Sequence, residues 1–136
     1  MKKIELKIEL DPVTDGATVT SDHPVSKEDG ALVIATTGES RIVDQDEANE
    51  ILERLTGKST CEYLGSTDYL MIYNRDKIIN ADDGRYFIGS AIIFNGTIRG
   101  IEMLTEDDYS SAATEFESRL VTLSADGERF KAFPIP

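Results

Sequence analysis

The chain contains one histidine and one cysteine, two residue types that often act in catalysis or bind transition metals. His23 lies in a polar segment beside a proline, with no nucleophile near it in the sequence, and we interpret it as a surface histidine. Lys58 lies close to Cys61, but Glu62 offsets its charge, which favours a partly buried structural thiol over a reactive one. The sequence therefore predicts no catalytic residue.

The carboxylates do not follow the spacing of a metal site. An EF-hand loop needs oxygen ligands at alternating positions, a central glycine and a closing glutamate, and residues 80–84 lack both the alternation and the glutamate. We interpret that segment as a turn. No zinc spacing, esterase serine motif or phosphate-binding glycine loop occurs. We therefore expect no metal and no other cofactor.

One small polar group is a candidate ligand site. Tyr73, Asn74 and Arg75 follow an apolar run, and such a group at the end of a strand can orient a ligand. The other interpretation is a turn with a local ion pair that involves Asp76. The group supports an alternative hypothesis, in which the chain is a small-molecule-binding or enzymatic domain with a pocket near these residues.

The charge of the chain is its most unusual global property. Asp and Glu number 26 against 14 Lys and Arg, which gives a net charge of −12. Such a chain repels nucleic-acid phosphate and anionic lipid and attracts basic protein surfaces. The candidate protein-binding residues are Asp46, Glu50, Glu53, Glu106, Asp107 and Asp108. Two simpler interpretations remain: acidity keeps the protein soluble, and residues 106–108 complement a helix dipole.

The 136 residues fit a single domain, 1–136. One cysteine cannot form an internal disulfide, and no apolar leader or bilayer-length run is present, so we expect a cytoplasmic protein. Residues 11–30 are polar and rich in turn signals, and we expect a mobile loop region there.

Helix signals occur twice. Asp44 with Glu47, and Thr105 with Asp108, have the spacing of a capping box. Apolar residues follow each pair at helical spacing, which predicts helices over residues 44–56 and 106–118.

The rest of the chain shows strand patterns. Residues 2–10 alternate apolar and charged side chains, and apolar runs cover residues 31–36, 41–43, 69–73 and 85–94. Asn95-Gly96 and Asp126-Gly127 predict hairpin turns. We therefore expect an α+β fold: a mainly antiparallel sheet of seven or eight short strands, with both helices packed on one face.

Residues 52–116 carry short motifs that can be compared with known families. These are the helix end at 55–58, Tyr73-Asn74, Asp83-Gly84, the strand at 88–93 and the helix start at 104–107. Together they resemble a small family of uncharacterised domains from phages, plasmids and conjugative elements of Firmicutes. No activity is assigned to that family, so the resemblance transfers no site residue. It implies a mobile-element context, in which small acidic proteins often bind host proteins.

The leading functional prediction is thus a non-enzymatic accessory protein that acts by protein contact and masks a basic, nucleic-acid-binding surface. The partner would be an unknown host or element protein with that surface; neither direct nucleic-acid binding nor membrane binding is expected. A structural or homo-oligomeric subunit is a further alternative, and the sequence does not predict an oligomeric state.

Overall fold

The computed structural model describes residues 29–98 and 100–136. Three expectations concern residues outside the described part of the chain. These are the strand at 2–10, the surface position of His23 and the loop region at 11–30, of which only residues 29 and 30 are described.

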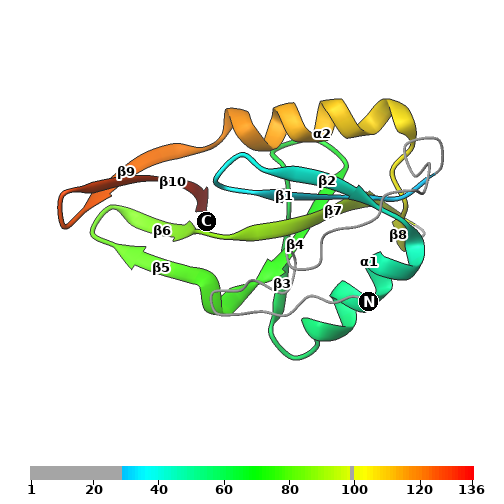
Figure 1. Cartoon of the computed structure of the whole chain (residues 1–136), viewed down its shortest axis with the longest axis horizontal. Helices are drawn as coiled ribbons and strands as arrows, with labels where there is room; N and C mark the ends of the chain where they lie inside the picture. Colours follow the sequence, from blue (N-terminus) through cyan, green and yellow to red (C-terminus); the bar gives the residue numbers. More distant parts are fainter. Residues whose placement is uncertain (1–28, 99) are drawn as a thin grey trace.

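The described chain forms two antiparallel sheets and two α-helices (Figure 1), which confirms the α+β class. The six-stranded sheet has the order β2-β1-β7-β4-β3, with β8 beside β7, and the four-stranded sheet has the order β5-β6-β10-β9. The strands are β1 (Ala31–Ala35), β2 (Ser40–Val43), β3 (Ser59–Tyr63), β4 (Tyr69–Asn74), β5 (Ile78–Ala81), β6 (Gly84–Phe87), β7 (Ser90–Thr97), β8 (Gly100–Glu102), β9 (Val121–Ala125) and β10 (Glu128–Ile135). The helices are α1 (Gln45–Arg54), α2 (Glu106–Ser118) and the short 3₁₀ helix η2 (Arg75–Lys77). These described strands outnumber the seven or eight expected, because the apolar run at 85–94 divides at Gly89 into β6 and β7 and the short strand β5 adds to the count.

The middle strands of the six-stranded sheet are buried on both faces. Every residue of β1 is buried, as are nearly all residues of β4 and β7. Because successive side chains point to opposite faces, these strands supply two separate cores. The first core takes Leu32, Ile34, Met71, Tyr73, Ala91 and Ile93 from the sheet. The second takes Ala31, Val33, Leu70, Ile72, Ile92 and Phe94.

The two helices lie on opposite faces of this sheet, so the expectation that both pack on one face is wrong. Helix α1 adds Ala48, Ile51 and Leu55 to the second core, whereas α2 adds Tyr109, Ala112 and Phe116 to the first. The physical reason is the composition of the strands. Both alternating sets of their side chains are apolar, and each set needs a cover that excludes water.

The four-stranded sheet joins the first core through a few aromatic contacts. The rings of Phe116 and Phe133 stack at 5.0 Å between centroids, and those of Tyr73 and Phe87 lie 4.5 Å apart. Beyond these contacts the β9–β10 ribbon extends away from the body of the molecule (Figure 1). Its turn is the one expected, with both Asp126 and Gly127 in the left-handed region.

The hairpin expected at Asn95-Gly96 exists, but its turn lies later in the chain. Both residues belong to β7, and Thr97 pairs with Gly100 across the β7–β8 hairpin. A Cβ atom on Gly96 would lie 2.7 Å from the Tyr63 hydroxyl, so this glycine permits a close approach of that ring. Gly100, with a φ of 123°, supplies the left-handed backbone at the turn.

Candidate functional site

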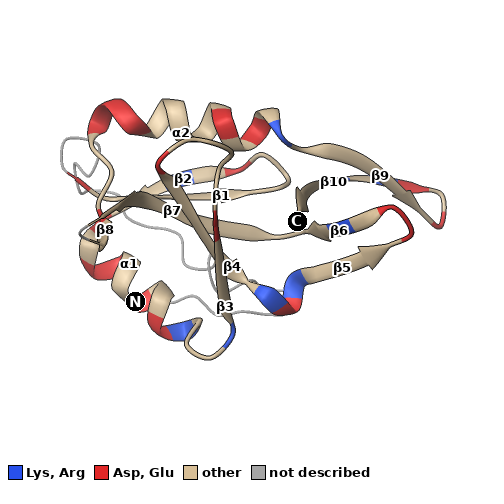
Figure 2. Cartoon of the chain, turned by 180° about the vertical axis from the view of Figure 1, so that it is seen from behind, with Lys and Arg blue, Asp and Glu red and all other residues tan. Residues whose placement is uncertain are grey.

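The six candidate acidic residues do not form one continuous face. Asp46, Glu50 and Glu53 are exposed on α1, and Glu106 and Asp107 are exposed on the first turn of α2. Since the two helices cover opposite faces of the sheet, these two groups point away from each other. Both helices nevertheless begin at the same end of the molecule, where β8 also lies (Figure 2).

That end carries a concentration of carboxylates. We define the acidic end as the exposed carboxylates of the first turn and middle of α1, of β8 and of the first turn of α2: Asp46, Glu50, Glu102, Glu106 and Asp107. Of these, Glu50 also pairs with Arg54 at 3.8 Å. Glu53 lies in the last turn of α1, away from this end. The nearby Arg41 of β2 is paired with Glu47 at 2.7 Å. The acidic end therefore presents mainly negative charge to solvent.

Asp108, the sixth candidate, has a structural role. Its carboxylate accepts hydrogen bonds from the Thr105 backbone N–H (2.9 Å) and hydroxyl (2.8 Å), from the Tyr69 hydroxyl (3.2 Å) and from the Asn95 side-chain amide (3.3 Å). Partial burial on its own would raise the pKa of Asp108, but these hydrogen bonds outweigh burial and hold the pKa below its usual value. Asp108 caps α2 and ties it to β4 and β7.

The candidate ligand group at Tyr73, Asn74 and Arg75 does not converge on a common point. Tyr73 is buried and its hydroxyl donates to Glu62 at 3.0 Å; burial, together with the adjacent Glu62 charge, raises the pKa of this phenol. The Asn74 side chain accepts the Asp76 backbone N–H at 2.8 Å and so begins η2. Arg75 is exposed and has no ion pair within the described chain, so the turn interpretation is right but the expected local ion pair is not formed.

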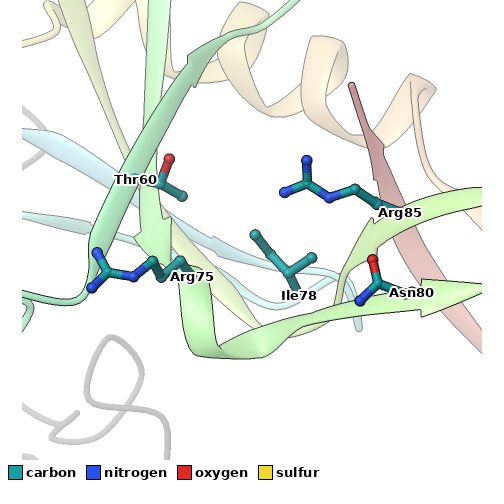
Figure 3. A pocket seen from close by; sticks show the side chains of 5 residues that line it. All are labelled: Thr60, Arg75, Ile78, Asn80 and Arg85. Carbon is teal, nitrogen blue, oxygen red and sulfur yellow. The ribbon is translucent and has the colours of Figure 1, made fainter.

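Arg75 does border a hollow of about 300 Å³ between the two sheets (Figure 3). The residues that line the hollow are Thr60 of β3, Arg75 of η2, Ile78 and Asn80 of β5 and Arg85 of β6. In Figure 3 the Arg85 side chain extends above Ile78 in the direction of Thr60, which lies on the opposite side of the hollow, whereas the Arg75 guanidinium points away from it. The hollow is open, and four of its five lining residues are polar or charged, unlike the deep apolar pocket that would favour an enzyme.

Two basic residues line this hollow. We define the cationic rim as Arg75 of η2 and Arg85 of β6; the exposed carboxylate of Asp76 follows Arg75 in η2. Within the described part of the chain, neither arginine has an Asp or Glu partner. Three other arginines are paired: Arg41 with Glu47, Arg54 with Glu50 and Arg119 with Glu115.

Sequence reasoning missed most of the hollow, because its residues are scattered singly along the chain. One signal was available: the turn at Asp82-Asp83 requires the strands on either side to pair, which places Asn80 opposite Arg85. The position of Thr60 depends on how the two sheets meet, and no local pattern encodes that.

Cys61 is exposed, so its expected partial burial is wrong. It belongs to β3, the last strand of the sheet, which contributes no buried side chain. Cys61 pairs with Ile72 of β4, and the second core includes Ile72 but not Cys61.

Within residues 29–98 and 100–136, no three His, Cys, Asp or Glu side chains are placed to share a metal ion. Neither described α-helix is long and apolar enough to cross a membrane. No family model matches the chain, and no curated protein and no solved structure matches it.

Proposed function

We propose that the protein is a non-enzymatic accessory protein that binds a basic surface of another protein through its acidic end. The observation that carries this proposal is the group of exposed carboxylates at one end of the fold. They belong to α1, β8 and the first turn of α2, whereas other exposed carboxylates lie singly or in pairs on η2, the β5–β6 turn and the β9–β10 tip (Figure 2).

The physical basis is long-range attraction. A protein of net charge −12 is repelled by nucleic acid and attracted to basic protein surfaces, and local clustering of its carboxylates orients the encounter. A surface that binds nucleic-acid phosphate has the matching charge, so the acidic end would mask such a surface. The resemblance to domains of mobile elements supports a host protein as the partner, and the absence of any disulfide requirement fits a cytoplasmic location.

The experiment compares two variants that lose the same charge at different places. Asp46→Asn with Asp107→Asn neutralises the acidic end, and Asp126→Asn with Glu128→Gln neutralises the tip of the β9–β10 ribbon. Each protein is used to capture partners from host lysate at low and high salt, and the dissociation constant of an identified partner is then measured by calorimetry.

We expect the acidic-end variant to bind several-fold more weakly, because each exposed ion pair contributes about 0.2–1 kcal/mol. The ribbon variant should bind like the unmodified protein, and binding should weaken as salt rises. Equal weakening of both variants, or binding that does not respond to salt, would contradict the proposal. So would the capture of no partner at low salt.

A further inference from the structure

The hollow between the sheets has a chemistry opposite to that of the chain as a whole. None of its five lining residues carries a carboxylate, although Asp and Glu are the majority among charged residues. Glu62 lies on the same edge strand as Thr60, and its carboxylate accepts a hydrogen bond from the Tyr73 hydroxyl. The lining of the hollow therefore offers hydrogen-bond donors and two guanidinium groups.

Arg85 is the central donor. One of its terminal nitrogens donates to the backbone carbonyl of Pro136 at 3.0 Å, which orients the guanidinium. A guanidinium has five N–H groups, so this bond leaves the others for a ligand. Asn80 lies directly opposite Arg85 in the β5–β6 register and supplies an amide, and Thr60 supplies a hydroxyl from the neighbouring sheet.

The remaining lining residues limit the kind of ligand. Ile78 gives the hollow an apolar floor, and the Arg75 guanidinium is held at the rim by a 2.7 Å hydrogen bond to the Gly57 carbonyl. A volume of about 300 Å³ is at the low end for ligand pockets. No aromatic ring lines the hollow, so no stacking surface for a base is offered.

We propose that this hollow binds a small organic anion, whose carboxylate or phosphate group is held by Arg85, Asn80 and Thr60. The availability of the two arginines at the hollow supports the proposal. Arg75 and Arg85, like Arg129 of the ribbon, have no Asp or Glu partner within the described residues; Arg75 and Arg85 donate one hydrogen bond each to a main-chain oxygen, of Gly57 and of Pro136. Of these three arginines, Arg75 and Arg85 line the hollow. A planar guanidinium fork suits bidentate contact with either anion. This site is independent of the acidic end.

The test uses two probes on the full chain at constant ionic strength. Citrate represents a ligand that binds through a carboxylate group, and inorganic phosphate represents a ligand that binds through a phosphate group. Isothermal titration calorimetry compares the unmodified protein with Arg85→Gln, Arg85→Lys and Asn80→Ala. Arg129→Gln is the matched control, because it removes an exposed cation on β10, away from the hollow.

We expect saturable binding of at least one probe by the unmodified protein and by the Arg129→Gln control. Arg85→Gln should weaken binding about tenfold or more, and Arg85→Lys should weaken it too, since lysine keeps the charge but loses the fork. Asn80→Ala, which leaves every charge in place, should bind more weakly than the unmodified protein, so the proposal stays testable if Arg85→Gln misfolds.

The probe that binds identifies the source: citrate alone indicates a carboxylate ligand, and phosphate alone a phosphate ligand. Failure of both probes to give saturable heat overturns the proposal. Equal weakening in Arg85→Gln and Arg129→Gln also overturns it, because that result indicates diffuse attraction and no site. Neither result affects the acidic end, whose variants leave the hollow unchanged.

Discussion

Replacing Asp108 by alanine should destabilise the protein far more than its position on an exposed helix turn suggests. The carboxylate is the acceptor for four hydrogen bonds, two from Thr105, one from Tyr69 and one from Asn95. It connects the start of α2 to two strands of the six-stranded sheet. The substitution removes a helix cap and two tertiary contacts in a single change.

The expected loss can be estimated from these bonds. Loss of a helix cap typically costs about 1 kcal/mol. The bonds to Tyr69 and Asn95 are long, at 3.2 and 3.3 Å, and each contributes up to about 1 kcal/mol. The free energy of unfolding should therefore fall by about 2–3 kcal/mol. Urea denaturation followed by far-UV circular dichroism at neutral pH measures this difference.

The same difference should depend on pH. Hydrogen bonding holds the pKa of Asp108 in the folded protein below that in the unfolded chain, which is about 3.9. Its stabilising contribution is thus complete above that value and is lost as pH falls through the folded pKa. The gap between the unmodified protein and Asp108→Ala should narrow below about pH 4.

Asp107→Ala is the control, since it removes the same charge from the same turn without removing a tertiary bond. If the two variants unfold at the same urea concentration, the carboxylate of Asp108 contributes only its charge, and the reasoning is refuted. If the difference in unfolding free energy between the unmodified protein and Asp108→Ala stays constant as the pH is lowered, the ionised carboxylate is not the acceptor of these hydrogen bonds.

Three further outcomes are expected. Phe116→Ala should lower the free energy of unfolding, measured in urea, by about 3–5 kcal/mol, because the ring is fully buried. Phe130→Ala is the control and should lower the free energy of unfolding by less, because Phe130 is half-buried. Gly30→Ala should lower the melting temperature, because its Cβ would collide with the Val43 carbonyl oxygen; an unchanged melting temperature would refute this close approach. Cys61 should react with a thiol reagent as completely in the native protein as in urea, and protection in the native state would contradict its exposure.

The helices and most described strands could be predicted from sequence because their signals are local. Asp44 accepts the Glu47 backbone N–H at 2.9 Å as its spacing suggested, and α2 begins at the expected residue. Asn95-Gly96 predicted the turn at the wrong residues, because each residue makes a contact with a part of the chain far away in sequence. Asn95 donates a hydrogen bond to Asp108, and Gly96 permits the close approach of the Tyr63 ring. A turn pattern cannot be distinguished from such uses by sequence alone.

The arrangement of the layers has a signal in the sequence. Uninterrupted apolar runs in β1, β4 and β7 indicate strands covered on both faces, which excludes a sheet with both helices on one side. The hollow had no comparable signal, because it forms where two sheets meet. The side chains of Tyr73 and Asn74 do not form a ligand site because both are buried in structural roles: Tyr73 packs in the first core against Phe87, and Asn74 begins η2.

The central strand β7 affects how the protein unfolds. It is hydrogen-bonded to β1, β4 and β8, and its neighbouring residues Ile92 and Ile93 belong to different cores. Because the centre of β7 is buried on both faces, we expect the amides of Ile92 and Ile93 to exchange with solvent only when both cores open. Because Ile92 and Ile93 are consecutive residues, a substitution that loosens the core under one helix should also loosen the core under the other.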